Sequence, residues 1–239
     1  MGTKIIEVKN VSKSYDHLQV LDGVSLTVSS GESFAIVGPS GVGKSTLLRI
    51  IVGLEVADSG IVEIHTKKIA MVFQYSALLN SYTVLENIAL ALHDRKLSKG
   101  EMRDIISEKL KLVGLDKYEN YYPDQLSGGQ RKRVGFARAI ANDPELILYD
   151  EPTSGLDPVL STLIEDYINK LSNKYKVASI IVTHQLSTIR RTAQKVGMLF
   201  KGKLLWEGDP VSFLKSDNPY VKQFVDATVE GPILAGLLE

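Results

Sequence analysis

The fold is decided by residues 38–45, which read Gly38-Pro39-Ser40-Gly41-Val42-Gly43-Lys44-Ser45 and fit the pattern G-x-x-x-x-G-K-[ST]. In such a loop the glycines let the backbone curl until successive N–H groups face one anion. The loop also opens a helix, whose N-terminal dipole favours phosphate. We expect Lys44 to neutralise the outer phosphates and Ser45 to offer its hydroxyl to Mg²⁺. An ordinary glycine-rich turn is the alternative, but a strand-like run at 34–37 precedes the loop and a helical pattern follows it.

About a hundred residues later, an apolar run at 146–149 ends in the adjacent acids Asp150 and Glu151. The run does not alternate with polar residues, which is typical of a central parallel strand that is buried on both faces. Many strands end in solvated acids without any function. Together with the phosphate-binding loop, however, the pair predicts a metal site at Asp150. Glu151 is then placed to take a proton from a water molecule or to orient it.

Outward from these two motifs, short β-branched runs alternate with helical patterns, which predicts an α/β fold. Residues 83–115 are helical with few strand signals, so we expect a helical subdomain inserted into the α/β core. Ser127 and Gln130 have the spacing of a helix capping box. The expected strands are 5–11, 24–28, 33–37, 61–64, 69–73, 146–149, 177–182, 196–200 and 203–206. The other expected helices are 43–52, 127–140, 159–171, 186–193 and 210–227.

Composition narrows the classes of function. Lys plus Arg and Asp plus Glu each number 28, so the chain lacks the basic excess that is typical of nucleic-acid-binding proteins. It has no cysteine, which excludes disulfides and thiolate metal sites. We find no signal-peptide pattern at the N-terminus and no apolar run of the roughly 20 residues that a membrane helix needs. If the chain serves a membrane process, we expect other chains to span the membrane.

A second anion-binding helix start is predicted at Leu126-Ser127-Gly128-Gly129-Gln130. Its glycines expose N–H groups and Ser127 adds a hydroxyl, so this stretch repeats the chemistry of the first loop. Because the first loop already accounts for one nucleotide, the second suggests contact with a nucleotide that is held by another copy of the chain.

With these motifs in this order, the chain resembles the ABC ATPase family over nearly its whole length. The resemblance implies that Gly38 to Thr46 form the Walker A loop, that 126–130 are the signature motif, and that Asp150 and Glu151 are the metal-binding and catalytic acids. It also implies an adenine-stacking role for Tyr15, contact of Gln74 with Mg²⁺ and the attacking water, a D-loop at 154–157, and a γ-phosphate contact for His184. From the residues alone, Tyr15 could equally be an ordinary strand tyrosine and His184 an ordinary surface or core histidine.

The same resemblance implies a P-loop NTPase core with a mostly parallel sheet, an N-terminal antiparallel β subdomain and a helical subdomain at about 75–135. It implies an ATPase that uses Mg²⁺, works as a head-to-tail dimer, and serves an integral membrane permease. The signature motif argues against a nucleotide kinase. The stretch between Lys44 and Gln74 is shorter than is usual in the family, so we expect a reduced edge of the antiparallel sheet.

Two further stretches are similar to the Mla/Mce-type phospholipid-trafficking ATPases. One is 131–140, and the other lies in the C-terminal tail at 217–239, where residues 218–226 and 230–233 carry the similarity. This similarity implies phospholipid movement between the two membranes of a diderm bacterium. The chain would lie peripherally on the cytoplasmic face of the inner membrane, with a permease and an Mce-type lipid-binding protein as partners. The alternatives are a solute importer, a lipoprotein-releasing system or, in another class, a non-transport ABC ATPase. The apolar end at 233–238 is expected to pack on the second ATPase or on the permease, while the helical face before it could dock on its own subunit.

Overall fold

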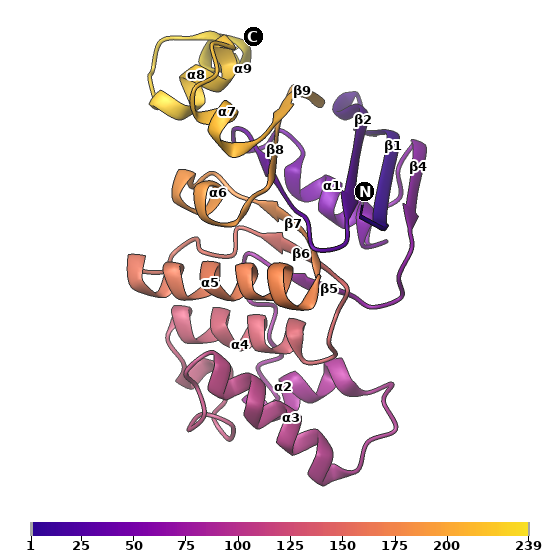
Figure 1. Ribbon diagram of the computed structural model, residues 1–239, viewed down its shortest axis with the longest axis vertical. Coiled ribbons are helices and arrows are strands. Elements are labelled where there is room, and N and C mark those ends of the chain that lie inside the picture. Colours follow the sequence, from indigo (N-terminus) through magenta and orange to yellow (C-terminus); the bar gives the residue numbers. More distant parts are fainter. Residues whose placement is uncertain (1, 239) are drawn as a thin grey trace.

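The computed structural model describes residues 2–238, and the side chains of residues 2–236 (Figure 1). The strands are β1 (Lys4–Tyr15), β2 (Leu18–Ser29), β3 (Ser33–Val37), β4 (Ser59–Ile64), β5 (Ile69–Val72), β6 (Leu146–Asp150), β7 (Ala178–Val182), β8 (Lys195–Phe200) and β9 (Lys203–Gly208). The α-helices are α1 (Lys44–Ile51), α2 (Val84–Ala89), α3 (Lys99–Leu112), α4 (Gly128–Ile140), α5 (Pro158–Tyr175), α6 (Leu186–Thr192), α7 (Pro210–Leu214), α8 (Pro219–Asp226) and α9 (Pro232–Leu238). Short 3₁₀ helices lie at Leu90–Leu92 and Pro123–Gln125.

Two sheets organise the chain. The larger has six strands in the order β5-β6-β7-β3-β8-β9, and its pairs are parallel except for the antiparallel β8–β9 pair. The smaller is antiparallel, in the order β2-β1-β4. This confirms the predicted α/β fold with a mostly parallel core and an N-terminal antiparallel sheet. Only the four residues 65–68 separate β4 from β5, which leaves no room for a further strand between them.

Strand β6 is buried on both faces, as its unbroken apolar run predicts. Leu146 and Leu148 belong to one hydrophobic cluster, which fills the space between the two sheets and helix α1. Ile147 and Tyr149 belong to a second cluster, which they share with the helical part of the chain. Because side chains alternate along a strand, this one strand forms a wall between two hydrophobic cores.

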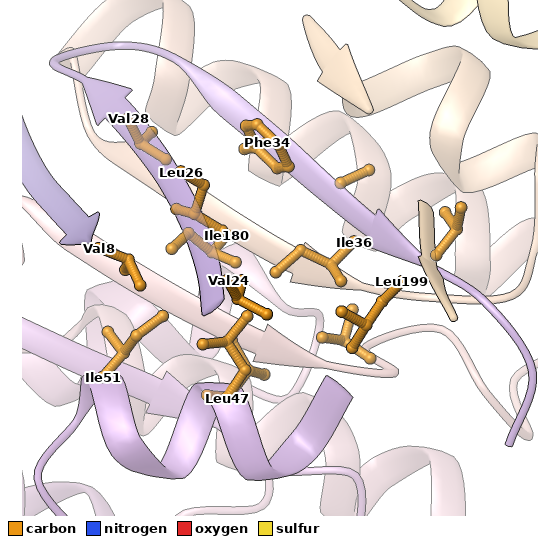
Figure 2. Packing of buried hydrophobic residues seen from close by; sticks show 14 of the residues in the cluster. Val8, Val24, Leu26, Val28, Phe34, Ile36, Leu47, Ile51, Ile180 and Leu199 are labelled. Atoms are coloured by element: carbon orange, nitrogen blue, oxygen red, sulfur yellow. The ribbon is translucent and has the colours of Figure 1, made fainter. Parts of the chain in front are cut away.

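Helix α1 is held by the first of these cores (Figure 2). Its residues Leu47 and Ile51 point toward Val8 and Val24 of the antiparallel sheet, and Leu47, Leu48 and Ile51 are at most 2% exposed. The helix directly follows the glycine-rich loop, since Gly43 is its N-cap. Packing of α1 between the sheets therefore fixes where the loop lies.

The helical subdomain lies on the side of the large sheet away from α1, where α5, α4 and then α2 and α3 follow one another (Figure 1). The helical pattern predicted at 83–115 forms more than one helix, because Thr83 and Ser98 each start a helix with a complete capping box. Asn87 is fully buried, and its amide holds the preceding loop through bonds to Leu79, Tyr82 and Thr83. Those contacts fix the segment that leads from Gln74 into the subdomain.

The C-terminal tail packs on its own chain. Val221 is fully buried and Ile233 is 9% exposed, and both belong to the core around α1. The expectation that the end of the chain packs on another subunit is therefore wrong for Ile233, because the turn at Gly231 brings this residue back onto α8. Leu234 stays 40% exposed. The side chains of residues 237 and 238 lie outside the described part of the chain.

The side chain of Gln223 holds this tail in place. It is 7% exposed, its amide nitrogen donates to the carbonyls of Thr228 and Val229, and its oxygen accepts from the N–H of Ile233 at 2.7 Å. A polar side chain buried with its partners satisfied is costly to remove, since each buried group left unpaired costs about 1–3 kcal/mol.

The variant Gln223→Ala is expected to release α9 while the rest of the chain stays folded. The N–H of Ile233 would lose its acceptor, so its hydrogen exchange should accelerate at least tenfold. Exchange measured residue by residue checks this, with Lys222→Ala, on the exposed side of α8, as the control. An Ile233 amide that exchanges equally slowly in wild type and Gln223→Ala would show that Gln223 does not hold the tail.

Among residues 2–238, no helix is both long enough and apolar enough to cross a membrane.

Candidate functional site

The glycine-rich loop has a shape that only glycine permits at two positions. Gly38 and Gly43 have φ values of 144° and 101°, which side chains disfavour. A Cβ atom on Gly38 would collide with the carbonyl of Leu199, and one on Gly43 would lie 2.7 Å from the carbonyl of Val20. The loop therefore fits tightly between β8 and β2, and its curvature is set by the fold before any anion binds.

Lys44 places a cation at this loop. Its Nζ donates to the carbonyls of Gly38 at 2.8 Å and Pro39 at 2.6 Å, and the residue is 9% exposed. Burial lowers the pKa of Lys44, while the negative charges of Glu151 and Asp150 act in the opposite direction. An anion that enters the loop would thus meet a desolvated ammonium group, whose attraction is stronger than that of a lysine in water.

Ser45 and Asp150 meet although 105 residues separate them. The Ser45 hydroxyl donates to Oδ1 of Asp150 at 3.0 Å, and Asp150 is 7% exposed. The contact forms because α1 follows the end of β3, and β6, which is separated from β3 by β7 in the same parallel sheet, ends at the same edge. A hydroxyl and a carboxylate are hard oxygen ligands, so this pair fits Mg²⁺.

Glu151 is held in an unusual backbone conformation directly after β6. Its φ is 49°, which is rare for a residue with a side chain, and its N–H donates to the carbonyl of Val182. Its Oε1 lies 2.8 Å from Nδ1 of His184, while its Oε2 is buried and has no hydrogen-bond partner among the described residues. Burying a carboxylate oxygen unpaired is costly, which suggests that this oxygen is kept for a substrate or a water.

The second glycine-rich stretch forms the predicted capping box. The Ser127 hydroxyl accepts from the N–H of Gln130, and the Gln130 side chain accepts from the N–H of Ser127. Gly128 and Gly129 follow in the first turn of α4, and Gly128 is exposed while Gly129 is partly buried. Helix α4 lies between α5 and the α2–α3 pair, away from α1 (Figure 1). Within one chain, therefore, the two glycine-rich helix starts lie apart and do not face the same ligand site.

Gln74 lies on the side of the second stretch. Together with Gly128, Lys132 and Ser154, among others, it lines a hollow of about 350 Å³. No hydrogen bond joins Gln74 to Ser45 or Asp150 in the part of the chain that the structure describes. The resemblance-based contact of Gln74 with the metal thus stays a prediction.

Tyr15 ends β1 beside the loop. It pairs with Leu18 across the hairpin, and β2 continues to Val20, whose carbonyl approaches Gly43. The ring is 41% exposed, and Nζ of Lys13 lies 5.3 Å from its centre. Tyr15 therefore presents an accessible aromatic surface near the loop.

A family comparison agrees with this geometry. The sequence profile of the family described as "ABC transporter" matches residues 21–154, more than half of the chain. The chain belongs to the ABC transporter family. It is the ATP-binding part of such a transporter, in a family for which ATP binding and hydrolysis are general.

Relatives of this ABC ATPase carry names that point to different cargoes. Protein TRIGALACTOSYLDIACYLGLYCEROL 3, chloroplastic, from Arabidopsis thaliana is 40% identical over 96% of this chain and 75% of its own length. The methionine import ATP-binding protein MetN 2 from Bacillus licheniformis is 38% identical over 95% of this chain and 72% of its own. The family is therefore certain, whereas the cargo is not common to these relatives.

A solved structure confirms the fold. The ATP-binding cassette MJ0796, whose structure is described as dimeric and in a post-hydrolysis state with ADP and Pi bound, superimposes with a TM-score of 0.82. The two are 33% identical, and the match covers 86% of this chain and 99% of that one. The α/β core, the antiparallel sheet and the helices of this ABC ATPase are thus those of a cassette.

Two groups near Glu151 in this ABC ATPase were not anticipated from the sequence. Lys132 of α4 donates to the carbonyl of Ser154, just after Glu151. On the other side, the fully buried Thr153 bonds to Gln185 and Thr188, which follow His184. The sequence offers only a weak signal for these contacts, because threonine, glutamine and lysine near a motif are common on solvated surfaces as well.

Proposed function

We propose that this ABC ATPase powers the movement of phospholipids between the inner and outer membranes of a diderm bacterium. It would act peripherally, on the cytoplasmic face of the inner membrane. The observation that carries the catalytic part is the buried carboxylate of Glu151, which lies near Lys44 and the Ser45–Asp150 pair and has one oxygen without a partner among the described residues. The lipid part is supported by 40% identity to a relative that is named after a galactolipid, and by the resemblance of 131–140 and the tail to phospholipid-trafficking ATPases.

In this proposal the loop from Gly38 to Thr46 cradles the phosphates of ATP. Its N–H groups and Lys44 offset the phosphate charge, and Lys44 exchanges its two carbonyl partners for phosphate oxygens. Ser45 and Asp150 would hold Mg²⁺, with Gln74 as a further ligand. When bound, Mg²⁺ neutralises charge that develops on the phosphates during transfer.

The chemical step is transfer of the γ-phosphoryl group to water. Glu151 accepts a proton from that water at Oε2, the oxygen that has no partner among the described residues, while its Oε1 stays bonded to His184. The His184 side chain is 60% exposed, so its far edge is accessible to the γ-phosphate. Catalysis of this reaction rests mainly on positioning and on electrostatic stabilisation, which a rigid turn at Glu151 provides.

A second copy of the chain would complete the site. Ser127 and Gly128 are exposed and Gly129 is partly buried. The helix start that they form lies away from the loop of the same chain, so we assign it to the nucleotide held by the partner in a head-to-tail dimer. Gln130 supports that helix start through the capping box. The dimeric state of the similar cassette supports this arrangement.

Tyr15 would stack on the adenine ring. We expect Tyr15→Ala to weaken ATP binding by about 0.5–1.5 kcal/mol, roughly two- to tenfold in Kd, because an aromatic stacking contact is lost. Tyr15→Phe keeps the ring and should bind almost as wild type. Calorimetric titration with ATP measures this, with the exposed Tyr175→Ala as the control. Equal affinity of Tyr15→Ala and wild type would remove Tyr15 from the site.

The membrane permease would dock between β5 and the helical subdomain. A groove of about 470 Å³ lies there, with Ile69, Met71 and Phe73 on its apolar side. Lys67, Lys68 and Arg138 add positive charge. The groove borders the segment that follows Gln74, so a docked permease would contact the route between the nucleotide and the helical subdomain. An Mce-type lipid-binding protein is the further partner we propose.

One alternative is favoured by a specific observation. The chain is 38% identical to a methionine import protein, so a solute importer is the second candidate. A lipoprotein-releasing system and a non-transport ABC ATPase have no such support here. The importer and the lipid transporter share every step at the nucleotide and differ only in the permease and its cargo.

Purification of the tagged chain from its native membranes in mild detergent, with mass spectrometry of proteins and lipids, separates these candidates. A permease, an Mce-domain protein and stoichiometric phospholipid are the expected result. A solute permease without bound lipid would instead support the importer. Absence of any membrane protein would contradict both.

A further inference from the structure

Lys132 links the start of α4 to the turn that carries Glu151. It lies in the second turn of the helix that begins after Ser127, and its Nζ donates to the carbonyl of Ser154. The N–H of Ser154 in turn donates to the carbonyl of Glu151 at 3.2 Å. Two consecutive hydrogen bonds therefore connect the helix with the backbone of the proposed catalytic base.

Packing strengthens this connection. A Cβ atom on Gly129 would lie 3.3 Å from Leu156 and 3.8 Å from Leu160, so the first turn of α4 rests directly on the D-loop and on α5. There is little space in which the helix start could shift without moving residues 154–156.

Electrostatics point the same way. Burial lowers the pKa of Lys132, and the charge of Glu151 acts against that shift. Lys132 forms no ion pair with any described residue within salt-bridge distance. Glu151 is the carboxylate whose charge acts on its pKa. The Lys132 ammonium group is half-buried and donates to a turn carbonyl. Partial burial of its charge costs free energy that a fully solvated surface lysine does not lose, which argues for a specific role.

We propose that Lys132 is a positioning residue, which transmits the docking of the partner's nucleotide on the start of α4 to Glu151 of the same chain. The inference rests on the proposed ATPase function and on the head-to-tail dimer. Nucleotide bound at Gly128 and Gly129 fixes α4, Lys132 fixes Ser154, and the turn then holds Glu151 in the conformation with φ of 49°. Each ATP would thereby prepare the catalytic base of the other site.

The test is Lys132→Met, which keeps the length of the side chain but removes its donor and charge. We expect kcat to fall on the order of ten- to a hundredfold, as for a misplaced catalytic group. The Kd for ATP should stay within twofold of wild type, and the Hill coefficient for ATP should fall toward one. Lys132→Arg, which keeps a donor and a charge, should recover most of both. The exposed Lys117→Met in the same subdomain is the matched control.

All variants are measured as the purified complex with the membrane partners, together with thermal unfolding. Wild-type kcat and Hill coefficient in Lys132→Met would overturn the inference. So would a loss of kcat that is accompanied by an equal loss of ATP affinity and a lowered Tm, or a loss that Lys132→Arg shares in full. If Lys132→Met does not fold, Lys132→Leu, which also lacks a donor and a charge, replaces it with the same expectations. A wild-type complex that hydrolyses no ATP would contradict the proposed function itself, which separates the two failures.

Discussion

We expect Glu151→Gln to lower the kcat of ATP hydrolysis by about 10²- to 10⁴-fold, which is the usual contribution of a general base. The amide has nearly the shape of the carboxylate but cannot accept the proton of the attacking water. The buried Oε2, which has no partner among the described residues, is the atom that this change disables. Binding of ATP should persist, because the phosphate contacts come from the loop and from Lys44.

Steady-state phosphate release measures the loss of turnover, and titration with ATP measures binding. Without hydrolysis the proposed dimer should remain closed, so size-exclusion chromatography with ATP should show a stable dimer for Glu151→Gln. Glu145→Gln is the control and should behave as wild type, because this exposed glutamate directly precedes β6 and so lies at the opposite end of the strand from Glu151. Hydrolysis at the wild-type rate by Glu151→Gln would require another residue as the base.

Lys44→Ala is expected to lose ATP affinity itself. Removing one member of a buried charge contact costs roughly 2–5 kcal/mol, which corresponds to at least about thirtyfold in Kd. Lys44 is 9% exposed and donates to two carbonyls of the loop, so the variant also removes the donor of those two bonds. Part of the loss can therefore appear as a lowered Tm, which thermal unfolding without nucleotide detects.

Calorimetry with ATP checks the Lys44 variant, and Lys117→Ala serves as the control for removal of one positive charge. Wild-type affinity in Lys44→Ala would contradict the assignment of the loop as a phosphate cradle. The two variants disable different steps. ATP binding without hydrolysis in Glu151→Gln, together with loss of ATP binding in Lys44→Ala, would show that Glu151 acts as the base and that Lys44 binds the phosphates.

The strands that are buried on both faces were predicted from the sequence, because their apolar runs are unbroken. The ends of the first hairpin were predicted poorly. Strand β1 continues to Tyr15 and β2 begins at Leu18, beyond the expected 5–11 and 24–28, because exposed polar residues pair there as well as apolar ones. Helix α9 was missed, since Gly231 and Pro232 indicate a break and the seven residues that follow are too few to show a period.

For the site, the two motifs were enough to predict that Ser45 and Asp150 both contact Mg²⁺. The structure brings the two side chains together at the edge where the parallel strands end. The direct bond between Glu151 and His184 was not predicted. It depends on a positive φ at Glu151, which no residue pattern announces. The bond from Lys132 to Ser154 escaped prediction for a similar reason, as it joins a helix to a turn whose packing only the fold defines.

Strand β6 has a consequence for how such a chain can be rebuilt. Leu146 and Leu148 pack in one core, while Ile147 and Tyr149 pack in the other. The core of the helical subdomain is therefore completed by side chains of β6. If the subdomain were grafted onto another cassette, its apolar side chains would have to pack against a different β6 strand, whose side chains would not match them. In evolution and in protein engineering alike, we expect the helical subdomain to be inherited together with the strand that it borrows, rather than exchanged as a separate module.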